Sequence, residues 1–258
     1  MSQMHVIKIG GQEAEQPAFL EAVAVYMQNL EGEKLIVHGG GKEISALCQQ
    51  WGVQSEFRQG HRVTCAQTLH AAEMVLSGTA NKRLVRFFLQ KGFKALGVSG
   101  SDLGLIQAQI KRGDQGEDWG LVGIPEKVDH QILNLWADLG WLPIIAPIGL
   151  GPNYTALNIN ADLAAAAVAA SVNAVGLHFL TAVNGVQENG GRLSHLNAGS
   201  FADLLANQIV TDGMIPKLEA GFSALSAGIP KVWIGQPHLA TQGTLLVQQE
   251  VAHGICTG

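Results

Sequence analysis

The sequence predicts an α/β fold in which a mainly parallel β-sheet is covered by helices on both faces. Short apolar segments typical of buried strands alternate with longer segments of helical periodicity along most of the 258 residues. Several of the apolar segments end directly in glycine, as expected where the chain turns at the edge of a sheet. The length is consistent with one large domain or two lobes.

Each predicted element rests on a local signal. Strands are predicted at residues 6–9, 35–37, 95–98, 142–145, 175–181, 230–234 and 244–248. Helices are predicted at residues 17–30, 42–51, 67–90, 128–139, 161–172, 199–207 and 216–227. The strands are short apolar runs, and Pro17 and Pro216 are residues favoured in a first helical turn. Leu69, Ala72 and Leu76 repeat at three- and four-residue steps in the longest helix.

Three segments are less regular. Residues 53–64 are expected to be extended, with a turn near Gln59-Gly60. Residues 104–124 alternate apolar and polar side chains around a turn rich in glycine and aspartate, which predicts a peripheral β-hairpin. Proline and glycine gather at residues 147–153, so we expect a lobe of residues 1–150 and a second lobe of residues 151–258 within a single domain.

Composition and charge exclude several classes of protein. Hydrophobic residues make up 47% of the chain and charged residues 14%, which excludes a disordered chain. The net charge is −5 without a basic run, which argues against a nucleic-acid partner. Cys48, Cys65 and Cys256 are far apart and form no C-x-x-C pair, so we expect no disulfide framework and no zinc site, and we assign no metal ligand.

No targeting or membrane segment is expected. The charge of Lys8 precedes any signal-like apolar region. Residues 163–187 carry no formal charge, but polar residues interrupt them, and they divide into a short helix and a strand rather than a membrane span. We therefore expect a cytoplasmic protein with no membrane contact.

Four segments place glycine or polar residues at the predicted end of a strand or start of a helix. They are Lys8-Ile9-Gly10-Gly11, His38-Gly39-Gly40-Gly41-Lys42, Asn158-Ile159-Asn160-Ala161-Asp162 and Thr211-Asp212-Gly213-Met214-Ile215-Pro216-Lys217. In open parallel sheets, ligands bind outside the carboxyl ends of the strands. Bare backbone N–H groups in glycine loops bind anions there. The second segment lacks the Walker A pattern, and His38 is interpreted as structural.

Each of these segments also has a simpler interpretation, which the sequence leaves open. Lys8 could be a surface residue of a turn, and Asn160 or Asp162 could simply cap a helix. Asn158, Asn160 and Asp162 alternate, however, and on an extended strand they would point the same way. Lys217 near a helix N-terminus opposes the macrodipole, which favours an anionic partner. Two lysines, one aspartate and several glycine loops together indicate phosphoryl transfer.

The motifs resemble those of the amino acid kinase family, and within it the acetylglutamate kinases. The matching stretches are residues 7–11, 37–41, 60–64, 78–82, 158–162 and 212–217, in the order and spacing of the family. The resemblance implies a three-layer α/β/α sandwich with a mainly parallel central sheet. It also implies transfer of the γ-phosphoryl group of ATP to the side-chain carboxylate of N-acetyl-L-glutamate in arginine biosynthesis. The acceptor would bind to the N-terminal lobe and ATP to the C-terminal lobe.

The resemblance also implies roles for individual residues. Lys8 and Lys217 would stabilise the migrating phosphoryl group, and Asp162 would hold both lysines in place. The acceptor would be bound by Gly40, Gly41, Arg62 and Asn158. The nucleotide would be bound by Gly10, Gly11, Thr181, Asn184, Gly185, Ile209, Thr211 and Gly213. ATP is the expected co-substrate, with Mg²⁺ held mainly by its phosphates. Arginine-inhibited members carry an additional N-terminal helix; here we expect none, together with a homodimer and weak or no arginine inhibition.

The sequence departs from the family at four places. Ala182 and Cys65 each stand where an aspartate is common, and Lys42 stands where a small residue or proline is usual. The C-terminal segment is atypical, with Gly243-Thr244 in place of the glycine–threonine pair near the family's end. None of these departures removes a residue that the resemblance assigns to catalysis.

Four alternatives to this interpretation are less well supported. A sibling kinase that acts on carrier-linked aminoadipate would need a basic docking face, which the net charge of −5 disfavours. Kinases of aspartate, carbamate, uridylate or glutamate fit the acceptor motifs less well. A non-catalytic amino-acid or nucleotide sensor would not need to retain Lys8, Asp162 and Lys217. A dinucleotide-dependent dehydrogenase is disfavoured because the G-x-G-x-x-G pattern is missing.

Overall fold

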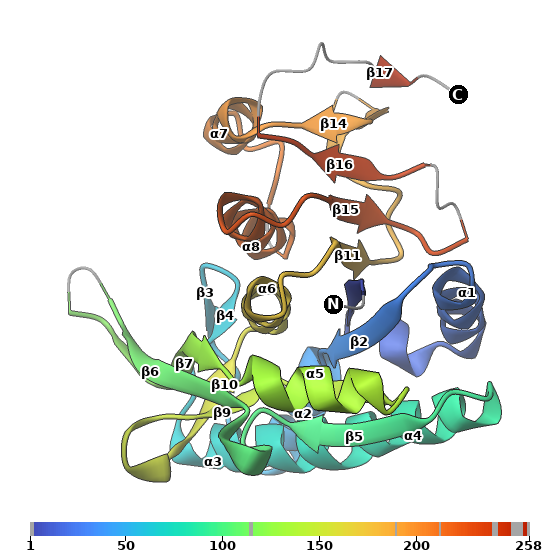
Figure 1. The fold of residues 1–258 in the computed structure, drawn as a ribbon. Helices are drawn as coiled ribbons and strands as arrows, with labels where there is room; N and C mark the ends of the chain where they lie inside the picture. The colour runs from blue at the N-terminus through green and yellow to red at the C-terminus, as the bar shows by residue number, and fades with distance from the viewer. Residues whose placement is uncertain are drawn as a thin grey trace.

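An eight-stranded sheet runs through the centre of the molecule in the order β14-β16-β15-β11-β1-β2-β8-β5 (Figure 1). The computed structural model describes residues 3–113, 116–188, 190–211, 213–238, 242–248 and 255–256. The strands of this sheet are β1 (Met4–Ile9), β2 (Glu33–His38), β5 (Ala95–Ser99), β8 (Leu142–Ala146), β11 (Gly176–Leu180), β14 (His195–Leu196), β15 (Val232–Gly235) and β16 (Thr244–Leu246). All neighbours are parallel except β15 and β16. The predicted parallel sheet is confirmed.

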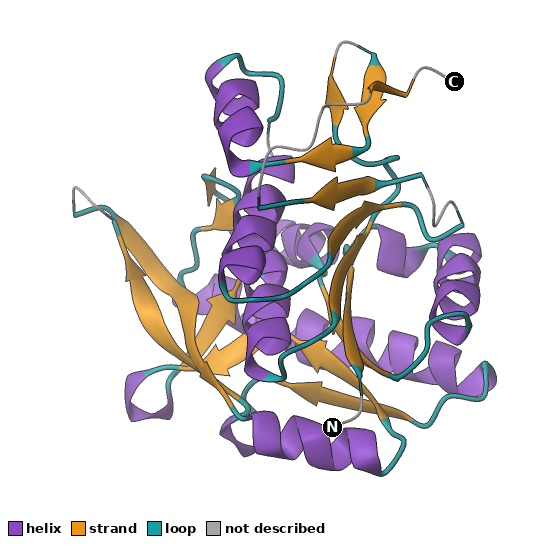
Figure 2. Cartoon of the chain, turned by 45° about the horizontal axis from the view of Figure 1, so that its top comes forward, coloured by secondary structure: helices purple, strands orange, loops and turns teal. Residues whose placement is uncertain are grey.

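Helices cover both faces of the sheet (Figure 2), as predicted. They are α1 (Pro17–Gln28), α2 (Gly41–Gln50), α3 (Ala66–Glu73), α4 (Asn81–Gln90), α5 (His130–Asp138), α6 (Ala161–Ser171), α7 (Ala198–Ala206) and α8 (Met214–Ser226). Because side chains alternate along a strand, Val6 packs with the α5, α6 and α8 layer, whereas Ile7 packs with α1 and α4. Lys8 therefore points to the same side as Val6.

The long helix predicted over residues 67–90 is confirmed with one difference. A π-helical segment, η2 (Met74–Ala80), lies between α3 and α4. The first turn is capped by Cys65, whose Sγ accepts a hydrogen bond from the backbone N–H of Thr68 at 3.5 Å. This observation gives the cysteine at position 65 a structural role at the helix start.

A second group of strands lies beside the central sheet. The strands β6 (Ile106–Arg112) and β7 (Asp118–Val128) form the predicted hairpin, and with β9 (Ile148–Leu150) and β10 (Ala156–Ile159) they close into a small barrel. The outer ends of β6 and β7 extend from the body (Figure 1). The base of the hairpin packs into the main core through Ile106, Ala108 and Val128, so only the outer ends of the two strands are peripheral.

The remaining elements are short. They are β3 (Phe57–Arg58), β4 (His61–Arg62), β12 (Gln187–Glu188), β13 (Gly191–Leu193), β17 (Ile255–Cys256), η1 (Glu13–Glu15), η3 (Asp102–Gly104) and η4 (Pro152–Tyr154). The turn predicted near Gln59-Gly60 joins β3 to β4, and both residues have positive φ. Among the helices of the described residues, none is long and apolar enough to cross a membrane.

Candidate active site

Two lysines converge on one aspartate at the carboxyl ends of β1 and β11. Lys8 Nζ lies 2.7 Å from Asp162 Oδ1, and Lys217 Nζ lies 3.0 Å from the same oxygen. Lys8 comes from β1, whereas Asp162 and Lys217 come from the first turns of α6 and α8. All three side chains are buried. The sequence motifs that carry them are 55 or more residues apart, and the fold brings them together.

Mutual pairing keeps this cluster charged in spite of its burial. Burial raises the pKa of Asp162, but the Lys217 and Lys8 ammonium groups outweigh it and hold that pKa at about 2. Burial lowers the pKa of Lys8, and the Asp162 carboxylate more than compensates, so that the pKa is raised. Burial and the neighbouring Lys8 lower the pKa of Lys217 to about 8. The cluster holds a net positive charge at neutral pH.

Asn160 caps the helix whose first turn carries Asp162. Its Oδ1 caps α6 by accepting hydrogen bonds from the N–H groups of Asp162 at 2.8 Å and Leu163 at 3.3 Å. The prediction that Asn158, Asn160 and Asp162 point the same way on one strand is therefore wrong, because β10 ends at Ile159 and the helix begins at once.

The two predicted glycine loops touch each other next to the lysine cluster. Gly39 N–H donates to Ile9 O at 3.0 Å, which joins the ends of β1 and β2. A Cβ on Gly11 would lie 2.7 Å from both the Cα and the N of Gly40, so only glycine allows this approach of the two backbones. The loop after β1 and the loop before α2 thus form one continuous backbone surface.

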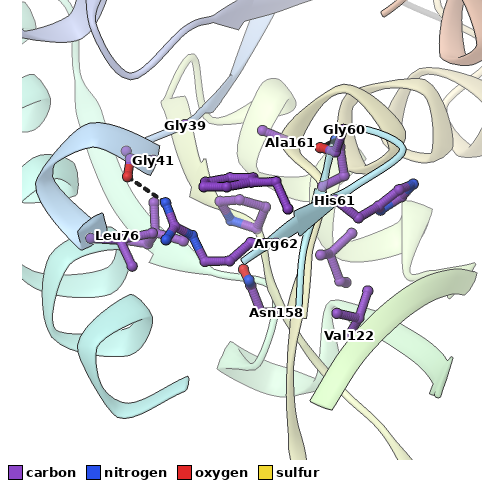
Figure 3. Close-up of a pocket in the computed structure, with 15 residues that line it drawn as sticks. Gly39, Gly41, Gly60, His61, Arg62, Leu76, Val122, Asn158 and Ala161 are labelled. Carbon is purple, nitrogen blue, oxygen red and sulfur yellow. Dashed lines mark hydrogen bonds between the residues drawn. The ribbon is translucent and has the colours of Figure 1, made fainter. Parts of the chain in front are cut away.

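A pocket is lined in part by the glycine loop before α2, residues 39–41 (Figure 3). Its wall includes Gly41, Arg62 and Asn158, all of which were predicted to bind the acceptor. Asn158 Nδ2 donates to Thr64 Oγ1 at 3.0 Å, so Thr64 fixes the orientation of the amide. The fold therefore assembles the predicted acceptor residues from α2, β4 and β10 around one concave space.

Arg62 is held by Gly41 and by three residues that the sequence did not single out, Ser45, Ser55 and Phe57. Its Nη1 donates to Ser55 Oγ at 2.7 Å, and its Nη2 donates to Ser45 Oγ at 2.8 Å and Gly41 O at 2.6 Å. The guanidinium carbon lies 4.4 Å from the centre of the Phe57 ring. These contacts order the guanidinium in advance of any ligand.

The β3–β4 hairpin contacts α8 and the residue that caps α6. A Cβ on Gly60 would lie 2.6 Å from Pro216 Cγ, one residue before Lys217. Asn160 Nδ2 donates to Gly60 O at 3.3 Å. The hairpin that carries Arg62 therefore packs directly against the helix that carries Lys217.

Apart from Gly10 and Gly11, the predicted nucleotide residues lie in two segments of the chain. Thr181, Asn184 and Gly185 follow β11, and Gly185 has positive φ and packs tightly against Thr244. The side-chain Oδ1 of Asn184 is buried and has no hydrogen-bond partner among the described residues. The second group, Ile209, Thr211 and Gly213, lies in the connection between α7 and α8, where Gly213 is the N-cap of α8. Asp212 of this motif lies outside the described residues.

Glu13 is a further charged residue of the site that sequence reasoning missed. Its Oε1 accepts hydrogen bonds from Thr181 Oγ1 and from the backbone N–H of Ala182, both at 3.2 Å. In the family that the sequence resembles, an aspartate is common at the position of Ala182. The structure instead brings the carboxylate of Glu13 to the backbone of that residue. No local pattern in the sequence could have indicated this contact, which joins residues 168 positions apart.

Known proteins share this architecture. The model of the amino acid kinase family matches residues 3–236. The acetylglutamate kinase of Chloroflexus aurantiacus is 39% identical over 235 residues, covering 91% of this chain and 92% of that protein. The acetylglutamate kinase of Geobacillus thermodenitrificans is 40% identical over 248 residues, covering 95% of each.

Solved structures agree. The crystal structure of smu.665 from Streptococcus mutans UA159 superposes with a TM-score of 0.85 at 29% identity, covering 95% of this chain and 99% of that one. The match of the family model to more than half of the sequence, together with relatives that align over nearly its full length, identifies the family. The chain belongs to the amino acid kinase family.

Proposed function

We propose that the protein transfers the γ-phosphoryl group of ATP to the side-chain carboxylate of N-acetyl-L-glutamate, in arginine biosynthesis. The observation that carries this proposal is the position of the Lys8–Asp162–Lys217 cluster. It lies beside two touching glycine loops, and the pocket of Arg62 opens next to them. The acetylglutamate kinases described above, at 39–40% identity, support this acceptor.

The acceptor is proposed to occupy the Arg62 pocket. Arg62 pairs with the α-carboxylate of N-acetyl-L-glutamate through its charge and through the N–H donors that Ser45, Ser55 and Gly41 leave free, because a hydrogen bond between charged groups is stronger than a neutral one. Asn158 binds the polar groups on the α side. The backbone N–H groups of Gly40 and Gly41 bind the carboxylate that receives the phosphoryl group.

The nucleotide is proposed to lie along the ends of β1 and β11. Gly10 and Gly11 contact its phosphates through backbone N–H groups. The remainder of the nucleotide is bound by Thr181, Asn184, Gly185, Ile209, Thr211 and Gly213. Asn184 Oδ1 is buried and lacks a hydrogen-bond partner among the residues that the structure describes, which supports this assignment, because a buried acceptor without a partner costs free energy unless a ligand supplies a donor.

The chemistry needs charge stabilisation rather than a general base. A side-chain carboxyl group has a pKa of about 4.3, so the acceptor is already an anion at neutral pH. The difficulty is the repulsion between this anion and ATP. Lys8 and Lys217 offset it and stabilise the charge that develops during transfer, while Asp162 holds both ammonium groups in position. Mg²⁺ supplies further positive charge and is proposed to be held mainly by the phosphates.

The organisation of the molecule is proposed to follow these roles. Residues 1–150 form the acceptor lobe and residues 151–258 the ATP lobe of one domain, and the contact between Gly60 and Pro216 joins them at the site. We also propose that the protein works in the cytoplasm as a homodimer. Light scattering on the purified protein tests the second point and should give twice the 27.3 kDa of one chain.

Hydroxylamine trapping of the acyl phosphate tests the proposed reaction. N-acetyl-L-glutamate, glutamate, aspartate and carrier-linked aminoadipate are compared in the presence of ATP. Turnover with N-acetyl-L-glutamate alone is the expected result. Activity with another carboxylate would retain the kinase chemistry and overturn the acceptor. ATP binding with no turnover on any of the four would instead favour a sensor.

A further inference from the structure

Glu13 presents a carboxylate where the proposed function requires a polyanion to bind. The residue begins η1, directly after the Gly10-Gly11 loop, and its side chain reaches the end of β11. A Cβ on Gly10 would overlap Glu13 Oε2, so the carboxylate lies against the backbone of the glycine loop itself. Its charge also acts on Lys8, whose pKa it helps to raise. A bare triphosphate in this loop would therefore be repelled by Glu13.

The carboxylate is anchored in this position rather than free to leave. Oε1 accepts two hydrogen bonds, from Thr181 Oγ1 and from the N–H of Ala182. The next residue, Ala14, is fully buried, its N–H donates to Gly10 O at 2.9 Å, and its carbonyl accepts from Arg83 Nε at 3.3 Å. Arg83 is itself paired with Glu43 through both of its terminal nitrogens. The segment that carries Glu13 is thus fixed to β1, β11 and α4.

A cation between Glu13 and the phosphates resolves this conflict. We infer that Glu13 provides the protein carboxylate that coordinates the Mg²⁺ of bound ATP; this inference rests on the proposed function. Oε1 is engaged by its two donors, while Oε2 accepts no hydrogen bond from the described residues and is available to a metal. In kinase sites Mg²⁺ is usually held by one or two carboxylates together with the phosphates of the substrate. The donor chemistry of Glu13 fits that pattern.

Nucleotide binding measured with and without the metal tests the inference. The variant Glu13→Gln keeps an oxygen that accepts from Thr181 and Ala182 but loses the charge. Calorimetry with the ATP analogue AMP-PNP, in excess Mg²⁺ and again in EDTA, gives the factor by which the metal strengthens binding. We expect this factor to fall about ten- to hundredfold in Glu13→Gln, as losses of metal contacts typically do. Glu15→Gln, an exposed carboxylate of the same η1, is the matched control and should leave it unchanged.

A second readout does not depend on turnover. The electron paramagnetic resonance spectrum of Mn²⁺ bound with AMP-PNP should change in Glu13→Gln and in the shortened Glu13→Asp, but not in Glu15→Gln. The inference would be overturned if Mg²⁺ strengthened AMP-PNP binding by the same factor in Glu13→Gln as in the unmodified protein. The inference would also be overturned if Glu13→Gln bound AMP-PNP more tightly by the same factor in Mg²⁺ and in EDTA. Glu13 would then act only as a negative charge that repels the phosphates. Absence of AMP-PNP binding by the unmodified protein would contradict the proposed function itself.

Discussion

Two polar clusters lie on opposite faces of the same central strands, β1 and β11. The lysine cluster consists of Lys8, Asp162 and Lys217, and the histidine cluster consists of Tyr26, His178 and His5. Lys8 faces α6 and α8 from the end of β1, whereas His178 faces α1 from the middle of β11. All of these side chains are buried except His5, which is half-buried, yet the two clusters differ in charge.

The partners of each cluster account for this difference. His178 Nδ1 lies 2.8 Å from Tyr26 Oη, and its Nε2 lies 2.9 Å from His5 Nδ1. The charges that act on this cluster belong to Lys34 and Lys231, both cations. Burial, with His5 and Lys231, lowers the pKa of His178 to about 3, so the ring is neutral. A buried group keeps its charge only where an opposite charge is close, as in the lysine cluster.

The largest effect is expected from removal of the shared counter-charge. In Asp162→Asn, two buried ammonium groups lose their carboxylate, and breaking such a buried pair typically costs about 3–5 kcal/mol of the free energy of unfolding. Urea denaturation measures this loss. Asp129→Asn is the control, because Asp129 caps α5 and asparagine caps a helix equally well. If Asp162→Asn lowered the free energy of unfolding by less than about 1 kcal/mol, the two buried ammonium groups would not need the Asp162 carboxylate as their counter-charge.

The lysines themselves are expected to act in the reaction. Lys8→Ala or Lys217→Ala should lower kcat by at least about a hundredfold, or roughly 2.7 kcal/mol of activation free energy, with KM changing less. The reason is that the ammonium groups meet charge that develops only during transfer. Steady-state kinetics with N-acetyl-L-glutamate checks this, with the exposed Lys42→Ala as control. A near-normal kcat in both variants would show that the two lysines do not act in catalysis.

Most of the fold was predictable because each long element carries its own signal. The alternation of Val6 and Ile7 between two packed layers and the proline in the first turn of α1 are examples. The barrel strands β9 and β10 were not predicted, because their pairing with β6 and β7 is set by contacts between distant segments. The same holds for the π-helical turn of η2, which interrupts an otherwise regular helical pattern.

The site residues that lie in a sequence motif could be predicted. The residues that reach the site only through tertiary packing could not. Lys8, Asp162 and Lys217 stand in recognisable segments, and the structure brings them within hydrogen-bond distance. Ser45 and Ser55, which hold Arg62, stand in no such segment. Their contacts arise from the approach of α2 to the β3–β4 hairpin, which is a property of the folded chain.

A fall in pH should destabilise the protein through its neutral buried histidines. In the unfolded chain His178 titrates near pH 6.5, whereas burial lowers its pKa to about 3 in the folded chain. Between these values the unfolded state binds more protons, so stability is full above pH 6.5 and falls as the pH decreases. His38 and His61, whose pKa values burial lowers to about 4, act in the same direction.

The contribution of His178 can be isolated by substitution. Between pH 7 and pH 5 the group should account for about 2 kcal/mol of the stability lost. The loss over this interval, measured by urea denaturation, should therefore be smaller by that amount in His178→Gln. The exposed His130→Gln should keep the slope of the unmodified protein. If the free energy of unfolding fell with pH as steeply in His178→Gln as in the unmodified protein, the His178 ring would be already protonated or exposed. The histidine cluster would then not be the neutral counterpart of the charged lysine cluster.

The smallest effect is expected for Tyr26 of the histidine cluster. Tyr26→Phe removes the hydroxyl group beside His178 Nδ1 but keeps the ring, which stacks on Trp233 at 5.8 Å. The loss of one buried hydrogen bond should cost about 1 kcal/mol of stability. It should leave kcat unchanged, because the cluster faces α1 and not the lysines. Tyr154→Phe, at a site 86% exposed, is the matched control and should change neither quantity. A fall in kcat for Tyr26→Phe at full stability would mean that the two faces of β11 are coupled, and that the neutral cluster also acts on the reaction.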